Sequence, residues 1–82
     1  MAMIRFRAAG STQDLYMPDS EAKALLEALG EELLTQGVLL YAELAAKCDS
    51  LAADPSRSAV LRSRARQLAG AARMGDVYYI QS

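Results

Sequence analysis

An apolar stripe with helical spacing runs through the middle of the chain, between residues 19 and 53. Its members recur three or four positions apart, which places them on one face of an α-helix. These members are Leu26, Leu29, Leu33, Gly37, Leu40, Leu44, Cys48 and Leu51. Pro18 precedes the stretch and Asp54-Pro55 follows it, so residues that interrupt helices stand at both ends. The pattern therefore predicts one long helix over residues 19–53.

Gly37 is the position at which this helix could end instead. The stretch Thr35-Gln36-Gly37-Val38 is compatible with a helix C-terminus in which Gly37 is left-handed and Val38 packs back on Leu33. However, the stripe crosses Gly37 without a change of phase, and no capping residue follows that would start a new helix. We therefore favour an unbroken helix, in which Gly30 and Gly37 would allow a second helix to approach closely.

Alternation of apolar and polar residues predicts strands on both sides of the helical region. Ile4 and Phe6 alternate with arginines, which then lie on the outer face of the sheet. Turn residues follow, and residues 13–17 alternate again, so residues 3–17 are predicted to form a β-hairpin. Residues 77–81 follow a Gly-Asp turn signal and are rich in β-forming side chains, which predicts a third strand.

The pair Asp54-Pro55 predicts a short connection to a second helix. Asp54 can cap that helix and Pro55 suits its first position, while Gly75 can end it near residue 74. A short connection favours an antiparallel helical hairpin. The expected fold is therefore a single α+β domain over residues 1–82 with the order β-β-α-α-β. A small antiparallel sheet would pack on a long hairpin made of residues 19–53 and 55–74.

The lengths of these elements predict an uncovered surface. A helix of about 33 residues spans about 50 Å, whereas the second helix spans about 30 Å and a strand of five residues about 17 Å. A second chain would have to cover the remainder of the stripe, so we expect a homodimer built through the long helix. The residues expected in this protein interface are Leu26, Leu29, Gly30, Leu33, Gly37, Leu40, Tyr41 and Leu44.

Charge is distributed unevenly although the formal net charge is only −1. Residues 19–53 carry a net charge of −5 and residues 54–82 carry +3, so the two parts are expected to pack on each other. Arg62, Arg66 and Arg73 share the polar side of the second helix and would form a basic ridge. Such a ridge could contact phosphates or an acidic partner. Arg57 and Arg64 lie nearer the apolar side, where they could reach acids of the first helix.

The chain has few of the residues and motifs that are typical of catalytic sites. It has no histidine, and therefore no imidazole base and no Ser-His or Cys-His pair. Ser20 and Lys23 match the S-x-x-K pattern, but the further motifs and the larger domain of such enzymes are missing, so we interpret Ser20 as a helix cap. Cys48, the only cysteine, lies on the apolar stripe and is expected to be a buried hydrophobe. The sequence predicts no enzyme, no metal site and no cofactor.

Composition completes the functional expectation. Sixteen of the 82 residues are alanine, so the large core side chains are mainly leucines. No stretch is apolar enough for a membrane span or a secretory signal, which favours a cytoplasmic protein. Arginine outnumbers lysine seven to two, as is typical of GC-rich bacterial or phage genes. The leading hypothesis is a small protein-binding factor, such as a regulator, inhibitor or chaperone-like accessory, that forms homodimers and binds another protein. The alternative is a nucleic-acid-binding regulator that uses the arginine ridge.

Overall fold

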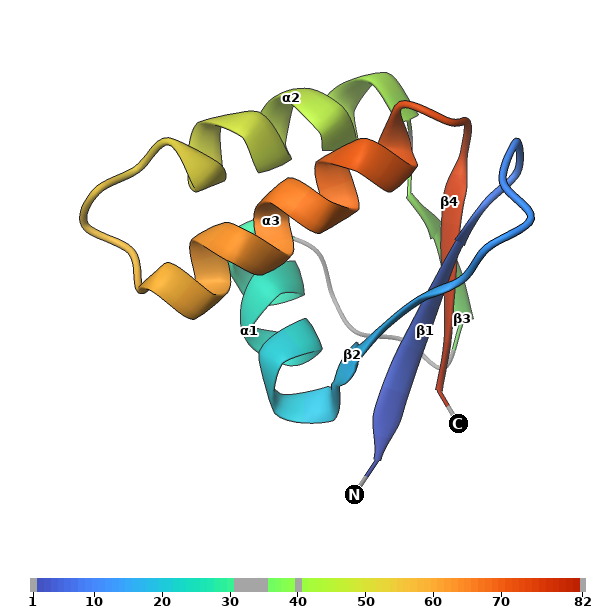
Figure 1. Ribbon diagram of the computed structural model, residues 1–82, viewed down its shortest axis with the longest axis horizontal. Helices are drawn as coiled ribbons and strands as arrows, with labels where there is room; N and C mark the ends of the chain where they lie inside the picture. The colour runs from blue at the N-terminus through green and yellow to red at the C-terminus, as the bar shows by residue number, and fades with distance from the viewer. Residues whose placement is uncertain (1, 31–35, 40, 82) are drawn as a thin grey trace.

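The computed structural model describes residues 2–30, 36–39 and 41–81, which form four strands and three helices (Figure 1). Their order along the chain is β1 (Met3–Ala8), β2 (Leu15–Pro18), α1 (Asp19–Ala28), β3 (Gln36–Leu39), α2 (Tyr41–Ala52), α3 (Ala59–Ala72) and β4 (Val77–Gln81). The α+β class is therefore confirmed, as are the hairpin near the N-terminus and the strand at residues 77–81. The element order differs from the expected one by an additional strand and an additional helix.

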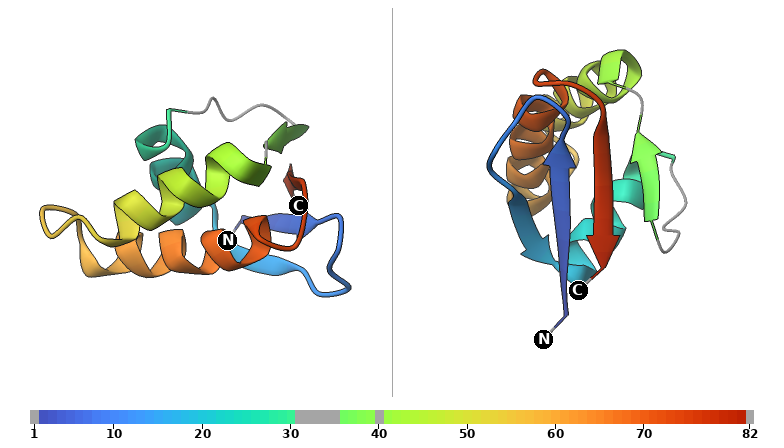
Figure 2. Two further views of the ribbon diagram at one scale, coloured as in Figure 1. Left: turned by 90° about the horizontal axis from the view of Figure 1, so that it is seen from above. Right: turned by 90° about the vertical axis from the view of Figure 1, so that its right-hand side faces the viewer.

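The strands form an antiparallel sheet in the order β2-β1-β4-β3. β1 is central because Phe6 pairs with Leu15 of β2 on one side and with Tyr79 of β4 on the other. All three helices lie on the same side of the sheet, and the right-hand view of Figure 2 looks onto the opposite side. One face of the sheet is therefore covered by helices, and none of the described helices covers the other.

The single long helix predicted over residues 19–53 is wrong, because this stretch contains α1, β3 and α2. The backbone leaves the helix at Gly30, whose φ of +78° is one that glycine adopts readily and other residues avoid. The Gly30 N–H donates to the Glu27 carbonyl at 3.0 Å and closes the last turn. The longest dimension of the molecule is 31 Å, which a helix of about 50 Å would exceed.

Both glycine hypotheses are also corrected. Gly37 is not a helix end, because it lies in β3 and pairs with Tyr79. Gly30 is not a point of close helix approach, since a Cβ built there would have no neighbouring atom within 4 Å. The apolar stripe nevertheless keeps its helical spacing, because α1 and α2 bury side chains in the same core. The spacing thus arises from burial of side chains of both helices in one core, and it does not require a continuous helix.

The second helix begins later than predicted. Residues 55–58 lie outside it, and the cap of α3 is Ser58, whose hydroxyl accepts a hydrogen bond from the Leu61 N–H at 3.2 Å. Asp54 instead accepts hydrogen bonds from the Ser56 N–H at 3.0 Å and the Ser56 hydroxyl at 2.7 Å, which holds a turn between the helices. α2 and α3 still lie side by side and run in opposite directions, so an antiparallel helix pair exists in shortened form (Figures 1 and 2).

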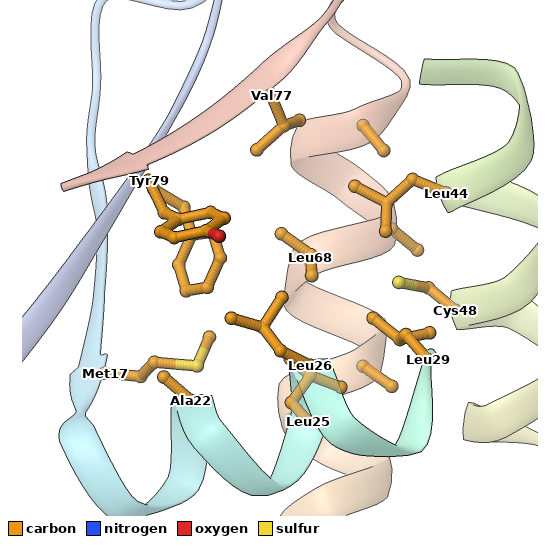
Figure 3. Close-up of a cluster of buried hydrophobic side chains, with 14 of the residues drawn as sticks. Met17, Ala22, Leu25, Leu26, Leu29, Leu44, Cys48, Leu68, Val77 and Tyr79 are labelled. Carbon is orange, nitrogen blue, oxygen red and sulfur yellow. The ribbon is translucent and has the colours of Figure 1, made fainter. Parts of the chain in front are cut away.

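The core lies between the covered face of the sheet and the three helices (Figure 3). The Phe6 and Tyr79 rings pack with their centroids 6.0 Å apart and meet leucines from each helix. These leucines are Leu25, Leu26, Leu44 and Leu68. Cys48 is buried among them, as expected, and burial raises the pKa of its thiol to about 11. The thiol is therefore neutral near pH 7 and acts as a small apolar side chain.

Candidate binding surface on the open sheet face

The leucines predicted to form an intermolecular interface lie in the core of their own chain. Leu26, Leu29 and Leu44 are each at most 5% exposed. A side chain buried in this way cannot also contact a second chain while the fold persists. The premise that part of the stripe needs a second chain to cover it is therefore wrong for these three residues.

The remaining described members of the predicted interface lie in different parts of the fold. Gly30 follows the end of α1, Gly37 lies in β3 and Tyr41 begins α2. Leu33 and Leu40 lie outside the described residues. The structure thus separates positions that a continuous helix would have aligned.

The predicted arginine ridge is largely occupied by contacts between α2 and α3. Arg62 donates from Nε to the Ala52 carbonyl at 3.1 Å. Arg73 donates from Nη2 to both carboxylate oxygens of Asp49, at 2.6 and 2.5 Å. Arg66 is exposed on α3. Two of the three ridge arginines therefore bind groups of this chain and do not form an unoccupied cationic surface.

The other arginines of the C-terminal half serve similar structural roles. Arg64 donates from Nε to Glu21 at 2.6 Å, which links α3 to α1 and confirms the expected contact with an acid of the first helix. Arg57 lies 3.7 Å from the Asp54 carboxylate in the interhelical turn and not beside α1. Two ion pairs, Arg64–Glu21 and Arg73–Asp49, thus join the basic C-terminal half to helices of the acidic stretch.

A different cluster stands on the side of the sheet opposite the helices. Along β1, Ile4 and Phe6 are buried, whereas the Arg5 and Arg7 side chains point to the outer face and are 34% and 44% exposed. This placement of the two arginines was expected from the alternation and is confirmed. The strand register then determines which residues of β2 and β4 join them on that face.

Two tyrosines flank these arginines. Tyr16 of β2 pairs with Arg5 and is 51% exposed, while Tyr78 of β4 pairs with Arg7 and is partly exposed. Asp14 immediately precedes β2 and lies close to both arginines. We call the surface formed by Arg5, Arg7, Asp14, Tyr16 and Tyr78 the open sheet face.

Asp14 holds this surface together. Its carboxylate accepts hydrogen bonds from Arg7 Nε at 2.5 Å and from Arg7 Nη2 at 2.9 Å, while Arg5 Nε is 3.6 Å from Oδ2. The hydrogen bonds from Arg7 lower the pKa of Asp14, with smaller contributions in the same direction from the charges of Arg7 and Arg5 and from the Tyr16 hydroxyl. Asp14 in turn raises the pKa of Arg7, and Tyr78 adds to this effect. Both tyrosines are therefore close enough to interact with the ion pair.

The position of Asp14 is the part of this surface that sequence reasoning missed. Alternation placed Asp14 and Tyr16 on the polar side of the second strand, but it did not identify the arginine that Asp14 binds. The register supplies that information, since Phe6 pairs with Leu15 and the next positions along the two strands are Arg7 and Asp14. A pairing of the hairpin that brings Ile4 and Phe6 opposite Met17 and Leu15 is the signal that would have found it.

Replacing Asp14 by Asn is expected to reduce stability at neutral pH, because the amide nitrogen that replaces one carboxylate oxygen cannot accept a hydrogen bond from Arg7 and the negative charge is lost. The pKa of Asp14 is lower in the folded state than its ordinary value of 3.8. The stabilisation is therefore complete above that value and is lost as the pH falls through the folded-state pKa. Urea unfolding at pH 7 and pH 2 should show a difference between wild type and Asp14→Asn that shrinks in acid.

Asp76→Asn is the matched control for this measurement, because Asp76 is exposed and its side chain makes no ion pair with a described residue. It should give a much smaller difference in unfolding midpoint at pH 7. A difference between wild type and Asp14→Asn that is the same at both pH values would contradict the assigned role of the carboxylate.

The remaining surface of the described residues has fewer features that indicate a binding site. A shallow groove between α1 and α2 is lined mainly by small or apolar side chains, with Lys47 and Asp54 at its margin. Within residues 2–30, 36–39 and 41–81, no group of three or more His, Cys, Asp or Glu side chains is placed to hold a metal ion. None of the helices in the described part of the chain is long and apolar enough to cross a bilayer.

Comparison with known proteins gives no further guide to the role of the open sheet face. No protein-family model, curated protein or solved structure matches this chain.

Proposed function

We propose that this protein is a small non-enzymatic binding factor that holds a partner protein on the open sheet face. The observation that carries the proposal is the placement of two tyrosines and two arginines on a sheet face that none of the described helices covers. Tyrosine and arginine are the residues that most often dominate the binding energy of protein interfaces. Each offers a large contact area together with a hydrogen-bonding group at its end.

The Asp14 contacts support this proposal because they order the surface before a partner arrives. Arg7 is held by two hydrogen bonds to one carboxylate, and the Asp14 side chain is only 10% exposed. A long side chain that is already fixed loses less conformational entropy on binding than a free one. The two tyrosines stand on β2 and β4, the strands on either side of β1, so the sheet also sets their spacing in advance.

Nucleic acid is a weaker candidate for this surface and for the arginine ridge. Binding to a phosphate backbone draws on several cations, each of which neutralises a phosphate. Arg62 and Arg73 are engaged with groups of α2, and Asp14 offsets one of the two positive charges on the open sheet face. A homodimer built through residues 19–53 is not part of the proposal, because Leu26, Leu29 and Leu44 of that stretch lie in the core.

The proposal is tested by capturing proteins from lysate of the source organism on immobilised wild type and on the double variant Tyr16→Ala/Tyr78→Ala. Truncation of residues that dominate an interface costs about 2 kcal/mol or more, so the partner captured by wild type should be depleted roughly tenfold or more on the double variant. Quantitative mass spectrometry provides the measurement. Tyr16→Ala alone, at an exposed position, repeats the test with little risk to the fold.

Val60→Ala is the matched control, because Val60 is an exposed apolar residue on α3, on the helical side of the molecule. It should capture the same protein as wild type in equal amount. Equal capture by all variants, or a loss confined to Val60→Ala, would contradict the assignment of the open sheet face.

A further inference from the structure

Arg5 occupies the middle of the open sheet face, beside Asp14 but not hydrogen-bonded to it. It pairs with Tyr16 of β2 on one side and with Ile80 of β4 on the other. Asp14 gives its two hydrogen bonds to Arg7, and the 3.6 Å separation between Arg5 Nε and Asp14 Oδ2 is too long for a third. Arg5 Nε is shielded from solvent and has no hydrogen-bond partner among the described residues.

A shielded N–H without an acceptor is energetically unfavourable. Because Arg5 Nε is shielded from solvent, an acceptor from a partner would have to bind the Nη groups of the same guanidinium. A guanidinium carries five N–H donors arranged as a planar fork and no acceptor. About a third of the Arg5 side chain remains exposed, so a partner can reach it from the solvent side. Arg5 is therefore the cation of this face that Asp14 does not engage by a hydrogen bond, and it can bind an anionic group of a partner.

The surroundings distinguish between kinds of anion. A carboxylate matches the guanidinium fork with two parallel hydrogen bonds and carries a single negative charge. Arg5, Arg7 and Asp14 together carry a net charge of +1, which balances one carboxylate but not a phosphate chain with one charge per nucleotide. Tyr16 adds a partly apolar ring beside the guanidinium, which suits a peptide that contributes apolar as well as acidic side chains.

We infer that the partner held on the open sheet face presents an acidic segment, one carboxylate of which binds Arg5 beside Tyr16. The inference rests on the proposed function, because it names the chemistry of the partner for that same surface. Arg7 then acts as a positioning residue that holds Asp14, while Arg5 makes the direct contact.

The test is a selection of random displayed peptides on immobilised wild type, with Arg5→Gln as a parallel target. Peptides retained by wild type are expected to be enriched in Asp and Glu, and Arg5→Gln should lose this enrichment. The most enriched peptide is then synthesised, and its affinity is measured by fluorescence polarisation. Loss of a charged hydrogen-bonding pair should weaken binding to Arg5→Gln about tenfold or more. Arg5→Lys, which keeps the charge without the planar fork, should lie between the two.

Arg66→Gln is the matched control, because it removes the same charge from the exposed side of α3. It should bind the peptide within about twofold of wild type, since an exposed charge away from the interface contributes little. An equal loss with Arg66→Gln would assign the effect to net charge and overturn the inference. Displacement of the peptide by an oligothymidylate in an Arg5-dependent way would identify nucleic acid as the occupant, with the same consequence.

The outcomes also separate this inference from the proposed function. Enriched peptides that are not acidic, and whose binding depends on Tyr16 and Tyr78 but not on Arg5, would overturn the inference and leave the binding surface in place. Peptides whose binding depends on none of these residues, or the absence of any acidic enrichment together with unchanged host-protein capture by the tyrosine variants, would overturn both.

Discussion

Leu26→Ala is expected to lower the free energy of unfolding by about 2–5 kcal/mol, the usual cost of removing a fully buried leucine side chain. Leu26 is 0% exposed and lies in α1 where the helix meets the sheet and α3 (Figure 3). Truncation would leave a cavity among neighbours from three elements, which can collapse only in part. Since small domains have a total stability of about 5–15 kcal/mol, urea unfolding should show a large shift of the midpoint.

Val60→Ala is the control for this experiment, because Val60 is 55% exposed and should change stability by no more than about 0.5 kcal/mol. Leu26→Val provides a milder truncation that keeps the fold measurable if the alanine variant does not fold. The result bears directly on the sequence-based interface hypothesis. If Leu26→Ala kept wild-type stability and instead reduced the molar mass seen by light scattering, Leu26 would be an interface residue and the core assignment would be wrong.

Local alternation was sufficient to predict β1, β2 and one side of the candidate surface. Ile4 and Phe6 alternate with Arg5 and Arg7, and the structure buries the first pair and exposes the second. Period-2 alternation works here because each strand has one face against the helices and one face away from them. The same alternation could not reveal that β4 inserts between β1 and β3, because that order depends on contacts between residues far apart in the sequence.

Helical periodicity failed in the middle of the chain for a physical reason. Leu26 and Leu44 belong to different helices, yet both face the same core, so their spacing matches that of one continuous stripe. A break was considered at Gly37, but the residue that ends the helix is Gly30, seven positions earlier. The local signal at Gly30 was present, since a glycine that follows a helical run is the commonest C-terminal cap. The apolar stripe outweighed the signal at Gly30, although the stripe arises because both helices bury side chains in one core.

The candidate surface was only partly accessible to sequence reasoning. Arg5 and Arg7 were placed on the outer face, but the preferred site was the apolar stripe of residues 19–53, and the arginines of the second helix were the alternative. Arg62 and Arg73 turned out to bind groups of α2, which depends on how closely two helices pack and cannot be read from charge spacing. The arrangement of Asp14, Tyr16 and Tyr78 around β1 follows from strand register, which single-sequence patterns do not determine.

Outside the core, the contact between the β1–β2 turn and the turn that precedes β4 is expected to be the part of the backbone most sensitive to substitution. The variant Gly10→Ala tests this expectation. A Cβ at Gly10 would lie 2.1 Å from the carbonyl oxygen of Met74, so the backbone of one turn would have to move. Beside it, the Ala9 N–H donates to the Asp76 carbonyl at 2.8 Å. Such overpacking costs about 1–3 kcal/mol, which urea unfolding would detect as a lower midpoint.

Gly70→Ala is the matched control, because Gly70 lies in the exposed part of α3 and a Cβ there would meet no neighbouring atom within 4 Å. Alanine favours helices by up to about 1 kcal/mol over glycine, so this variant should be more stable than wild type. Opposite signs for the two substitutions would support the contact, whereas equal effects would contradict it.

The Gly10 contact also links stability to the candidate function. It joins the β1–β2 turn to the turn that begins β4, and the register that follows places Tyr78 opposite Arg7. Gly10→Ala should therefore weaken capture of the partner protein even at temperatures where the variant remains folded, while Gly70→Ala should leave capture unchanged. Normal capture by a folded Gly10→Ala variant would show that the open sheet face tolerates movement of these turns, and its binding residues would then have to lie nearer β2 than β4.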